Sequence, residues 1–294
     1  MLHHHPIPRD VLGCIVTGYA KGGTTLLEDL IVNTTVMESG FEGGLLLADA
    51  PRDGIPEPFA TNLLEGWRLP ASFLDRYREC GSFEAGYRLL RKSSKKLKRH
   101  GAPLIDKAPQ YLMQLDDVMR RAPGTPVVVV IRDPLHVAVS WLELGNSLGD
   151  TVAWLRAATE AFAAAIESAD FAASLFVVNF GELLQEVDAT MALLHAWLGL
   201  PHVPMPVKKK AMYGLPYVQS GREGKPRCIE VDRHDMASRC SPEMLDRIRY
   251  ELAAAIPEAD RIVGLPTGPV SGRTLLGLEP VVCALAKVDC SMDS

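Results

Sequence analysis

The sequence feature that most constrains the fold is a glycine-rich turn that separates an apolar run from a segment with helical spacing. Residues 11–17 are apolar and favour a strand, whereas residues 24–33 place leucines and an isoleucine on one side of a helix. The turn between them reads Gly18-Tyr19-Ala20-Lys21-Gly22-Gly23. Glycines let backbone N–H groups approach an anion closely, and the first turn of a helix carries the positive end of its dipole. A strand, a glycine-rich turn and a helix in this order predict a site that binds phosphate.

The spacing within this turn differs from the Walker loop of nucleotide kinases, G-x-x-x-x-G-K-[ST]. Lys21 comes before the last two glycines, and Thr24 follows Gly23 directly. Lys21, Thr24 and Thr25 nevertheless offer one positive charge and two hydroxyl groups to an anion. The sequence therefore favours a phosphate site of another class, and a metal-dependent P-loop phosphotransferase is the alternative.

Five consecutive β-branched residues at 127–131 predict a parallel strand that is buried on both faces. Further strands are expected at residues 104–106 and 175–180. Strands that alternate with helices imply a parallel sheet with right-handed crossovers. We therefore expect an α/β chain with a P-loop-like three-layer fold, in which helices flank a central parallel sheet. The other expected helices lie within 71–100, 111–121, 136–144, 151–169, 183–198 and 241–255.

The chain is long enough for one large domain, and we expect residues 1–294 to form it. Residues 1–10 are expected to be a flexible tail, and residues 265–294 a C-terminal extension whose structure the sequence does not assign. Residues 49–70 and 204–239 are rich in proline and glycine. They predict long irregular segments, the second of which passes over the site.

Composition and charge argue against several function classes. The net charge is −5 and the pI is about 5.9, so the chain has no general electrostatic attraction to nucleic acid or to an anionic membrane. No apolar run reaches the roughly 18 residues that span a bilayer, and no signal-type segment is present, which favours a cytoplasmic protein. The six cysteines lack metal-ligand spacing, so we expect free thiols and no metal site; a disulfide between Cys228 and Cys240 stays open.

Three separated segments carry a family resemblance. Residues 19–25, YAKGGTT, are similar to the loop that holds the 5′-phosphosulfate in sulfotransferases that use 3′-phosphoadenosine 5′-phosphosulfate (PAPS). Arg132-Asp133-Pro134, with Ser140 eight positions after the arginine, is similar to the segment that binds the 3′-phosphate in that family. Residues 106–111, DKAPQY, resemble the K-x-P-x-Y segment of its carbohydrate and tyrosylprotein branches. The resemblance spans roughly residues 11–255 and implies PAPS as co-substrate, 3′-phosphoadenosine 5′-phosphate (PAP) as product and no metal.

The resemblance also implies roles for individual residues. Arg132 and Ser140 would bind the 3′-phosphate, and Lys107 would stabilise charge on the transferring group. Arg222, in the segment SGREGKP, is similar to the arginine of the K-G-R-x-H-P loop that closes over the nucleotide. That segment departs from the pattern, because a serine replaces the first lysine, one residue is added and a lysine replaces the histidine. The residues that would hold the 5′ end of PAPS are Lys21, Gly22, Gly23, Thr24 and Thr25.

The implied reaction transfers a sulfuryl group from PAPS to a hydroxyl group, in line, with a carboxylate as base. Lys21 would stabilise the leaving phosphate, and Glu42 is the implied base, with Glu38, Asp106 or a histidine as alternatives. We expect the acceptor to be a sugar or a glycosylated or small metabolite. A nucleotide-binding module that has lost catalysis is the other alternative.

Overall fold

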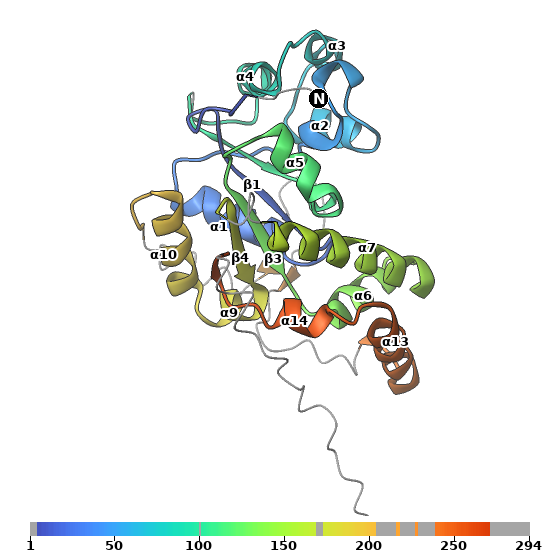
Figure 1. The fold of residues 1–294 in the computed structure, drawn as a ribbon. Helices are drawn as coiled ribbons and strands as arrows, with labels where there is room; N and C mark the ends of the chain where they lie inside the picture. Colours follow the sequence, from blue (N-terminus) through green and yellow to red (C-terminus); the bar gives the residue numbers. More distant parts are fainter. Residues whose placement is uncertain are drawn as a thin grey trace, which may run out of the picture.

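A mostly parallel five-stranded sheet forms the centre of this computed structural model, which describes residues 5–99, 101–168, 173–203, 216–217, 227–228 and 239–270. Its strand order is β2-β1-β3-β4-β7 (Figure 1). The first four strands run parallel and β7 runs antiparallel to β4, so the predicted parallel sheet has an antiparallel edge. The strands are β1 (Leu12–Gly18), β2 (Leu104–Lys107), β3 (Val127–Ile131), β4 (Leu175–Asn179) and β7 (Gly268–Pro269).

The strands supply two apolar cores, because successive side chains point to opposite faces of the sheet. In β3, Val127 and Val129 pack into one core, and Val128 and Val130 pack into the other. All residues of β3 are buried, as the β-branched run predicts. This arrangement confirms the expected three layers (Figure 1). The second core is covered by α1 (Thr24–Thr34), α9 (Phe180–Gln185) and α10 (Val187–Leu198).

Most of the remaining helices cover the first core. α13 begins as the sequence suggests, because the Ser241 side chain accepts a hydrogen bond from the Met244 N–H and Pro242 is the first helical residue. The helices that cover the first core are α2 (Phe59–Gly66), α3 (Phe73–Arg78), α4 (Phe83–Ser93), α5 (Leu115–Arg121), α6 (Pro134–Leu142), α7 (Leu148–Glu167), α13 (Pro242–Ala255) and α14 (Ala259–Val263). The short 3-10 helices are η1 (Leu45–Leu47), η2 (Pro51–Asp53) and η3 (Pro109–Gln114).

Three segments differ from the sequence-based expectations or add to them. The expected irregular connection at 49–70 contains α2, which forms because Phe59 and Leu63 enter the core from one face of the helix. Within the expected N-terminal tail, Ile7 is only 4% exposed and packs against the core. Within 265–294, β7 pairs with β4. Residues 204–239 lie mostly outside the described residues, apart from the paired strands β5 (Pro216–Tyr217) and β6 (Arg227–Cys228).

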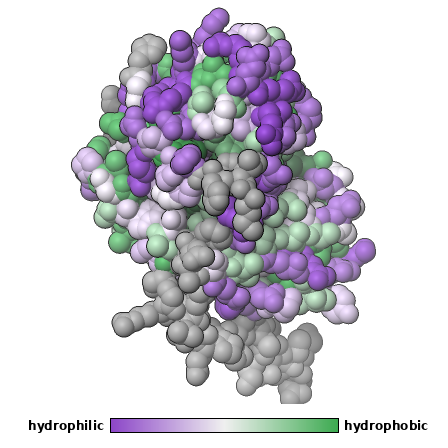
Figure 2. All heavy atoms as spheres, turned by 45° about the horizontal axis from the view of Figure 1, so that its top comes forward, coloured by the Kyte–Doolittle hydropathy of each residue, from purple (hydrophilic) through white to green (hydrophobic). Residues whose placement is uncertain are grey.

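Hydrophilic side chains cover most of the surface near α3 and α4 (Figure 2). Ion pairs on this surface join Arg78 to Asp75 at 3.1 Å and Arg88 to Glu84 at 2.8 Å. In the described part of the chain, no helix has the length and apolarity that a membrane crossing requires. Among the same residues, no group of three or more His, Cys, Asp or Glu side chains is arranged to hold a metal ion.

Candidate active site

The predicted phosphate loop joins β1 to α1 in backbone conformations that favour glycine. Gly23 has a φ of 105°, and a Cβ atom on Gly22 would lie 2.7 Å from the Tyr19 carbonyl oxygen. Lys21 also has a positive φ, 70°. Within the described residues, no side chain caps the N-terminus of α1, and its first turn holds no acidic residue. The N–H groups of this turn are therefore suited to binding an anion.

Aromatic residues of α6 and α7 pack against this loop. The Trp141 indole N–H donates a hydrogen bond to the Ala20 carbonyl at 3.0 Å, and the Tyr19 hydroxyl is 2.6 Å from the Thr159 hydroxyl. The Trp154 ring lies 4.9 Å from the Trp141 ring and 6.3 Å from the Tyr19 ring. Burial raises the pKa of Tyr19 to about 12. These contacts hold the loop backbone in a fixed conformation.

Arg132 follows β3 and reaches the phosphate loop, because β3 is the neighbour of β1. Its guanidinium donates a hydrogen bond to the Lys21 carbonyl at 3.0 Å and lies 4.8 Å from the centre of the Phe180 ring. Burial, and secondarily the positive charge of Arg239, lower the pKa of Arg132 to about 10, although Asp133 opposes this shift. The two sequence motifs therefore meet at the carboxyl ends of adjacent strands.

Ser140 lies on α6 in a cluster with His136, Glu143 and Arg239. Its hydroxyl donates a hydrogen bond to the His136 carbonyl at 2.9 Å and accepts one from Arg239 at 3.2 Å. Arg239 also binds the Glu143 carboxylate, at 2.7 and 2.5 Å. Burial lowers the pKa of His136; the Asp133 charge opposes this shift, and the charges of Arg132 and Arg239 add to it. Arg132 and Arg239 contribute guanidinium donors of the kind that bind phosphate, and Glu143 is the counterion of Arg239 in this structure.

Lys107 ends β2 and is buried completely on the other side of the phosphate loop. Its ammonium nitrogen lies 3.3 Å from Glu42 Oε1 and 3.6 Å from Glu28 Oε2. It also donates a hydrogen bond to the Thr25 hydroxyl at 3.4 Å and sits 4.7 Å from the centre of the Phe41 ring. The cluster joins β2 to the first turns of α1, next to the phosphate loop.

Glu42 is the part of this cluster that faces solvent. Its backbone forms a bridge with Lys107, and the Gly43 N–H donates a hydrogen bond to the Lys107 carbonyl at 3.2 Å. The Glu42 side chain is 19% exposed, whereas the Lys107 side chain is fully buried. A hydroxyl group from outside can therefore reach the Glu42 carboxylate.

Glu38, the first alternative base, lies at the opposite end of the same strand edge. It bridges to Leu104, at the start of β2, and is 6% exposed. Its carboxylate accepts hydrogen bonds from the Lys98 N–H and from the Arg99 guanidinium, each at 2.9 Å. Glu38 is therefore occupied in a structural ion pair away from the phosphate loop.

Asp106, the second alternative, is sealed inside the protein at 1% exposure. The hydroxyl groups of Tyr87 and Tyr111 donate hydrogen bonds to its carboxylate, the latter at 2.6 Å. Burial raises the pKa of Asp106 to about 6, although these hydrogen bonds and one from the Gly44 backbone oppose the shift. Its surroundings are those of a structural carboxyl group.

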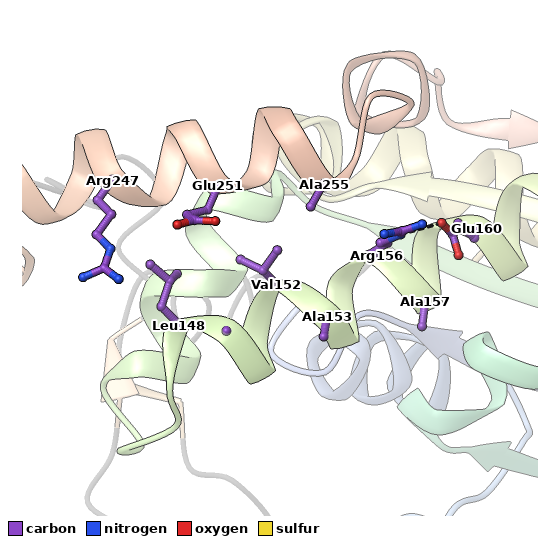
Figure 3. Close-up of a pocket in the computed structure, with 10 residues that line it drawn as sticks. Leu148, Val152, Ala153, Arg156, Ala157, Glu160, Arg247, Glu251 and Ala255 are labelled. Atoms are coloured by element: carbon purple, nitrogen blue, oxygen red, sulfur yellow. Dashed lines mark hydrogen bonds and ion pairs between the residues drawn. The ribbon is translucent and has the colours of Figure 1, made fainter.

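A separate groove of about 550 Å³ lies between α7 and α13 (Figure 3). Leu148 and Val152 contribute apolar surface, and Arg156 pairs with Glu160 at its edge at 2.7 Å. None of its lining residues belongs to the clusters around the phosphate loop, Arg132 or Lys107. The groove is therefore distinct from the candidate site.

The structure brings most of the residues named in the sequence analysis together around the phosphate loop, and it adds others that were not named. Arg222 lies outside the described residues. Glu28, Arg239 and the aromatic support of the loop were not predicted. Glu28 and the supporting aromatic residues match the apolar or polar pattern of ordinary helices, and Arg239 lies 99 positions from Ser140, so no local motif marks them.

Comparisons with known proteins agree with this geometry. A sequence model of the sulfotransferase family matches residues 14–204. The fold is similar to the sulfotransferase domain of the Synechococcus PCC 7002 olefin synthase, with a TM-score of 0.59, 15% identity, and coverage of 87% of this chain and 96% of that one. It is also similar to the sulfotransferase domain from the curacin biosynthetic pathway, with a TM-score of 0.50, 15% identity, and coverage of 90% and 95%. No curated protein matches the sequence. Because the family model spans well over half of the chain, the resemblance noted in the sequence is confirmed and the chain belongs to the sulfotransferase family.

Proposed function

We propose that this sulfotransferase, acting as a single domain, transfers the sulfuryl group of PAPS to a hydroxyl group of a sugar or of a glycosylated or small metabolite. The observation that carries the proposal is the order of three clusters along the sheet. The phosphate loop follows the central strand β1, with Arg132 after β3 on one side and Lys107 with Glu42 beside β2 on the other. This order suits a donor with a phosphate at one end and its reactive group at the other.

The donor's two anionic ends match the chemistry of the residues present. The uncapped start of α1 and the Lys21 ammonium suit the 5′-phosphosulfate, as do the Thr24 and Thr25 hydroxyls. Arg132, Ser140 and Arg239 suit the 3′-phosphate. Arg222 remains a proposed contact on the strength of the resemblance. Since fixed cations and backbone donors can neutralise both phosphates, we propose a reaction without a metal ion.

In the proposed reaction, the acceptor oxygen bonds to sulfur while the bond between sulfur and the 5′-phosphate oxygen breaks, and PAP leaves. Glu42 accepts the proton of the acceptor hydroxyl. Lys21 stabilises the negative charge that develops on the leaving phosphate. On the strength of the resemblance, the positive charge of Lys107, which donates a hydrogen bond to the Thr25 hydroxyl at 3.4 Å, stabilises charge on the transferring group.

Three observations support Glu42 as the base. Its side chain is partly exposed, it lies 3.3 Å from Lys107, and Lys107 in turn contacts Thr25 of the phosphate loop. Glu38 is paired with Arg99 at the far end of β2, and Asp106 is enclosed by two tyrosines. A base must reach the acceptor proton, and Glu42 has the most open path to solvent of the three.

The proposal is tested by incubating the protein with ³⁵S-labelled PAPS and a panel of sugars, glycosides and small alcohols, with and without EDTA. We expect label transfer to at least one hydroxyl acceptor, with equal rates in both arms. Transfer of phosphate from ATP that requires Mg²⁺ would favour a phosphotransferase instead. Tight PAP binding without transfer to any acceptor would favour an inactive nucleotide-binding module.

A further inference from the structure

We infer that Glu28 is a positioning residue for the reaction: it shares the buried Lys107 ammonium with Glu42 and so leaves Glu42 available to take a proton. The inference rests on the proposed function. Glu28 lies in the second turn of α1 and is only 5% exposed.

The fold brings Glu28 to Lys107 through the geometry of α1. Glu28 lies three positions after Thr25, so both side chains share one face of the helix. That face packs on β1 and β2, and it presents both residues to the Lys107 ammonium nitrogen, at 3.6 Å and 3.4 Å. The other Glu28 oxygen accepts a hydrogen bond from the Ser39 hydroxyl. Glu28 is therefore held in place from both sides.

The charges in this cluster do not balance in pairs. One fully buried ammonium faces two carboxylates, those of Glu28 and Glu42. A buried ammonium requires one carboxylate as counterion, because an unpaired buried charge is strongly destabilising. With Glu28 in this role, Glu42 retains its negative charge as a surplus that attracts a proton. Without Glu28, Glu42 would be the only counterion of Lys107 and would hold a proton less readily.

Other titratable groups lie near the cluster, and the charge of Glu28 acts on three of them. Lys96 is half-buried and feels both charges, since Glu28 raises its pKa and Lys107 lowers it, against the larger lowering by burial. The negative charge of Glu28 also contributes to the raised pKa values of Asp106 and Cys14, after the larger effect of burial.

The experiment compares Glu28→Gln, which removes the charge, with Glu28→Asp, which keeps it. Ser39→Ala is the matched control, because it removes the hydrogen bond to Glu28 and leaves all charges in place. For each protein, kcat and KM for ³⁵S-PAPS are measured from pH 5 to pH 9 with the acceptor found in the panel, and the Kd of PAP is measured by calorimetry.

We expect Glu28→Gln to lower kcat by up to about tenfold at pH 7, while KM for PAPS and the Kd of PAP change less than about threefold. Both glutamate oxygens lie within 3.6 Å of Nζ, so the two carboxylates are at most about 7 Å apart. At this distance the charge of Glu28 acts on Glu42 directly, so its loss should move the acidic limb of the kcat profile to lower pH. Glu28→Asp should keep the wild-type limb. An unmoved limb in Glu28→Gln, or the same loss of kcat in Ser39→Ala, would overturn the inference.

A second measurement does not depend on turnover. Glu28→Gln, Glu42→Gln and the double variant form a cycle in thermal unfolding. Each single variant leaves Lys107 one counterion, whereas the double variant leaves none, so its Tm should fall about 10 °C further than the sum of the two single effects. If the Tm changes of the two single variants add up to that of the double variant, and the wild type transfers sulfuryl groups, the inference that both glutamates share Lys107 is refuted while the proposed function stands. A wild-type protein that transfers no sulfuryl group would instead refute the proposed function, and with it the catalytic role of Glu28, whatever the cycle shows.

Discussion

The free energy of unfolding of the wild-type protein should fall as pH rises because Asp106 loses its proton, and this fall should be absent in Asp106→Asn. Burial raises the pKa of this carboxyl group from 3.8 to about 6. Because the folded protein holds the proton more tightly than the unfolded chain, this contribution to stability is fully present below pH 3.8 and is lost as pH rises to about 6. A shift of about two pKa units corresponds to about 3 kcal/mol of unfolding free energy.

The assay is urea unfolding of the wild-type protein and of Asp106→Asn at several pH values between 4 and 8. The asparagine amide brings a constant cost where it meets the Gly44 backbone donor, so the test is the change with pH. We expect the stability of the wild type, relative to the variant, to fall by about 2.5 kcal/mol across this range, most of it below pH 6. A matched control, Asp75→Asn on the exposed face of α3, should keep the wild-type pH dependence.

A stability difference between wild type and Asp106→Asn that stays constant with pH would refute this reasoning. The variant also tests the role of Asp106 in the reaction. A structural carboxyl group predicts kcat within a few-fold of the wild type at pH 7. A loss of 10²-fold or more in a folded variant that still binds PAP would make Asp106 the base instead of Glu42.

Four further substitutions separate donor binding from chemistry. Arg132→Ala should weaken PAP binding by about 1.5–3 kcal/mol and leave AMP binding nearly unchanged, as measured by calorimetry, because the lost charged contact is specific to the 3′-phosphate. Glu42→Gln should lower kcat by about 10²–10⁴-fold with PAP affinity intact, whereas Glu38→Gln should affect Tm more than kcat; the reverse pattern would exchange their roles. Lys21→Ala should reduce both kcat and PAP affinity, and a variant with full activity would remove Lys21 from the reaction.

The sheet and the glycine-rich turn could be predicted because their signals are local. The β-branched run at 127–131 permits little except a strand buried on both faces, and the glycines before Thr24 mark a turn in which a Cβ atom would collide with the Tyr19 backbone or the Phe180 ring. The helix in 49–70 was missed because its apolar positions lie among prolines and glycines, and burial of Phe59 and Leu63 decides its structure. Local composition carries no record of such tertiary packing.

Prediction from the sequence has the same limit for the carboxylates of the candidate site, because their contacts are also tertiary. Glu42 is the implied base in the sequence and Glu38 an alternative, and the structure separates them by their register beside β2, which puts one at each end of the strand. Glu28 belongs to the pattern of an ordinary amphipathic helix, and its contact with Lys107 spans 79 positions. Pairings of this kind depend on strand order and helix rotation, neither of which a motif encodes.

The central claim is that the site recognises a donor with a 3′-phosphate, and the most direct measurement is calorimetric titration of the protein with PAP and with AMP, which differ only in that phosphate. Arg132, Ser140 and Arg239 provide charged and hydroxyl donors for it. We predict that PAP binds at least about tenfold more tightly than AMP, since a charged hydrogen-bonded contact contributes about 1.5–3 kcal/mol. Equal affinity for the two nucleotides would contradict the account.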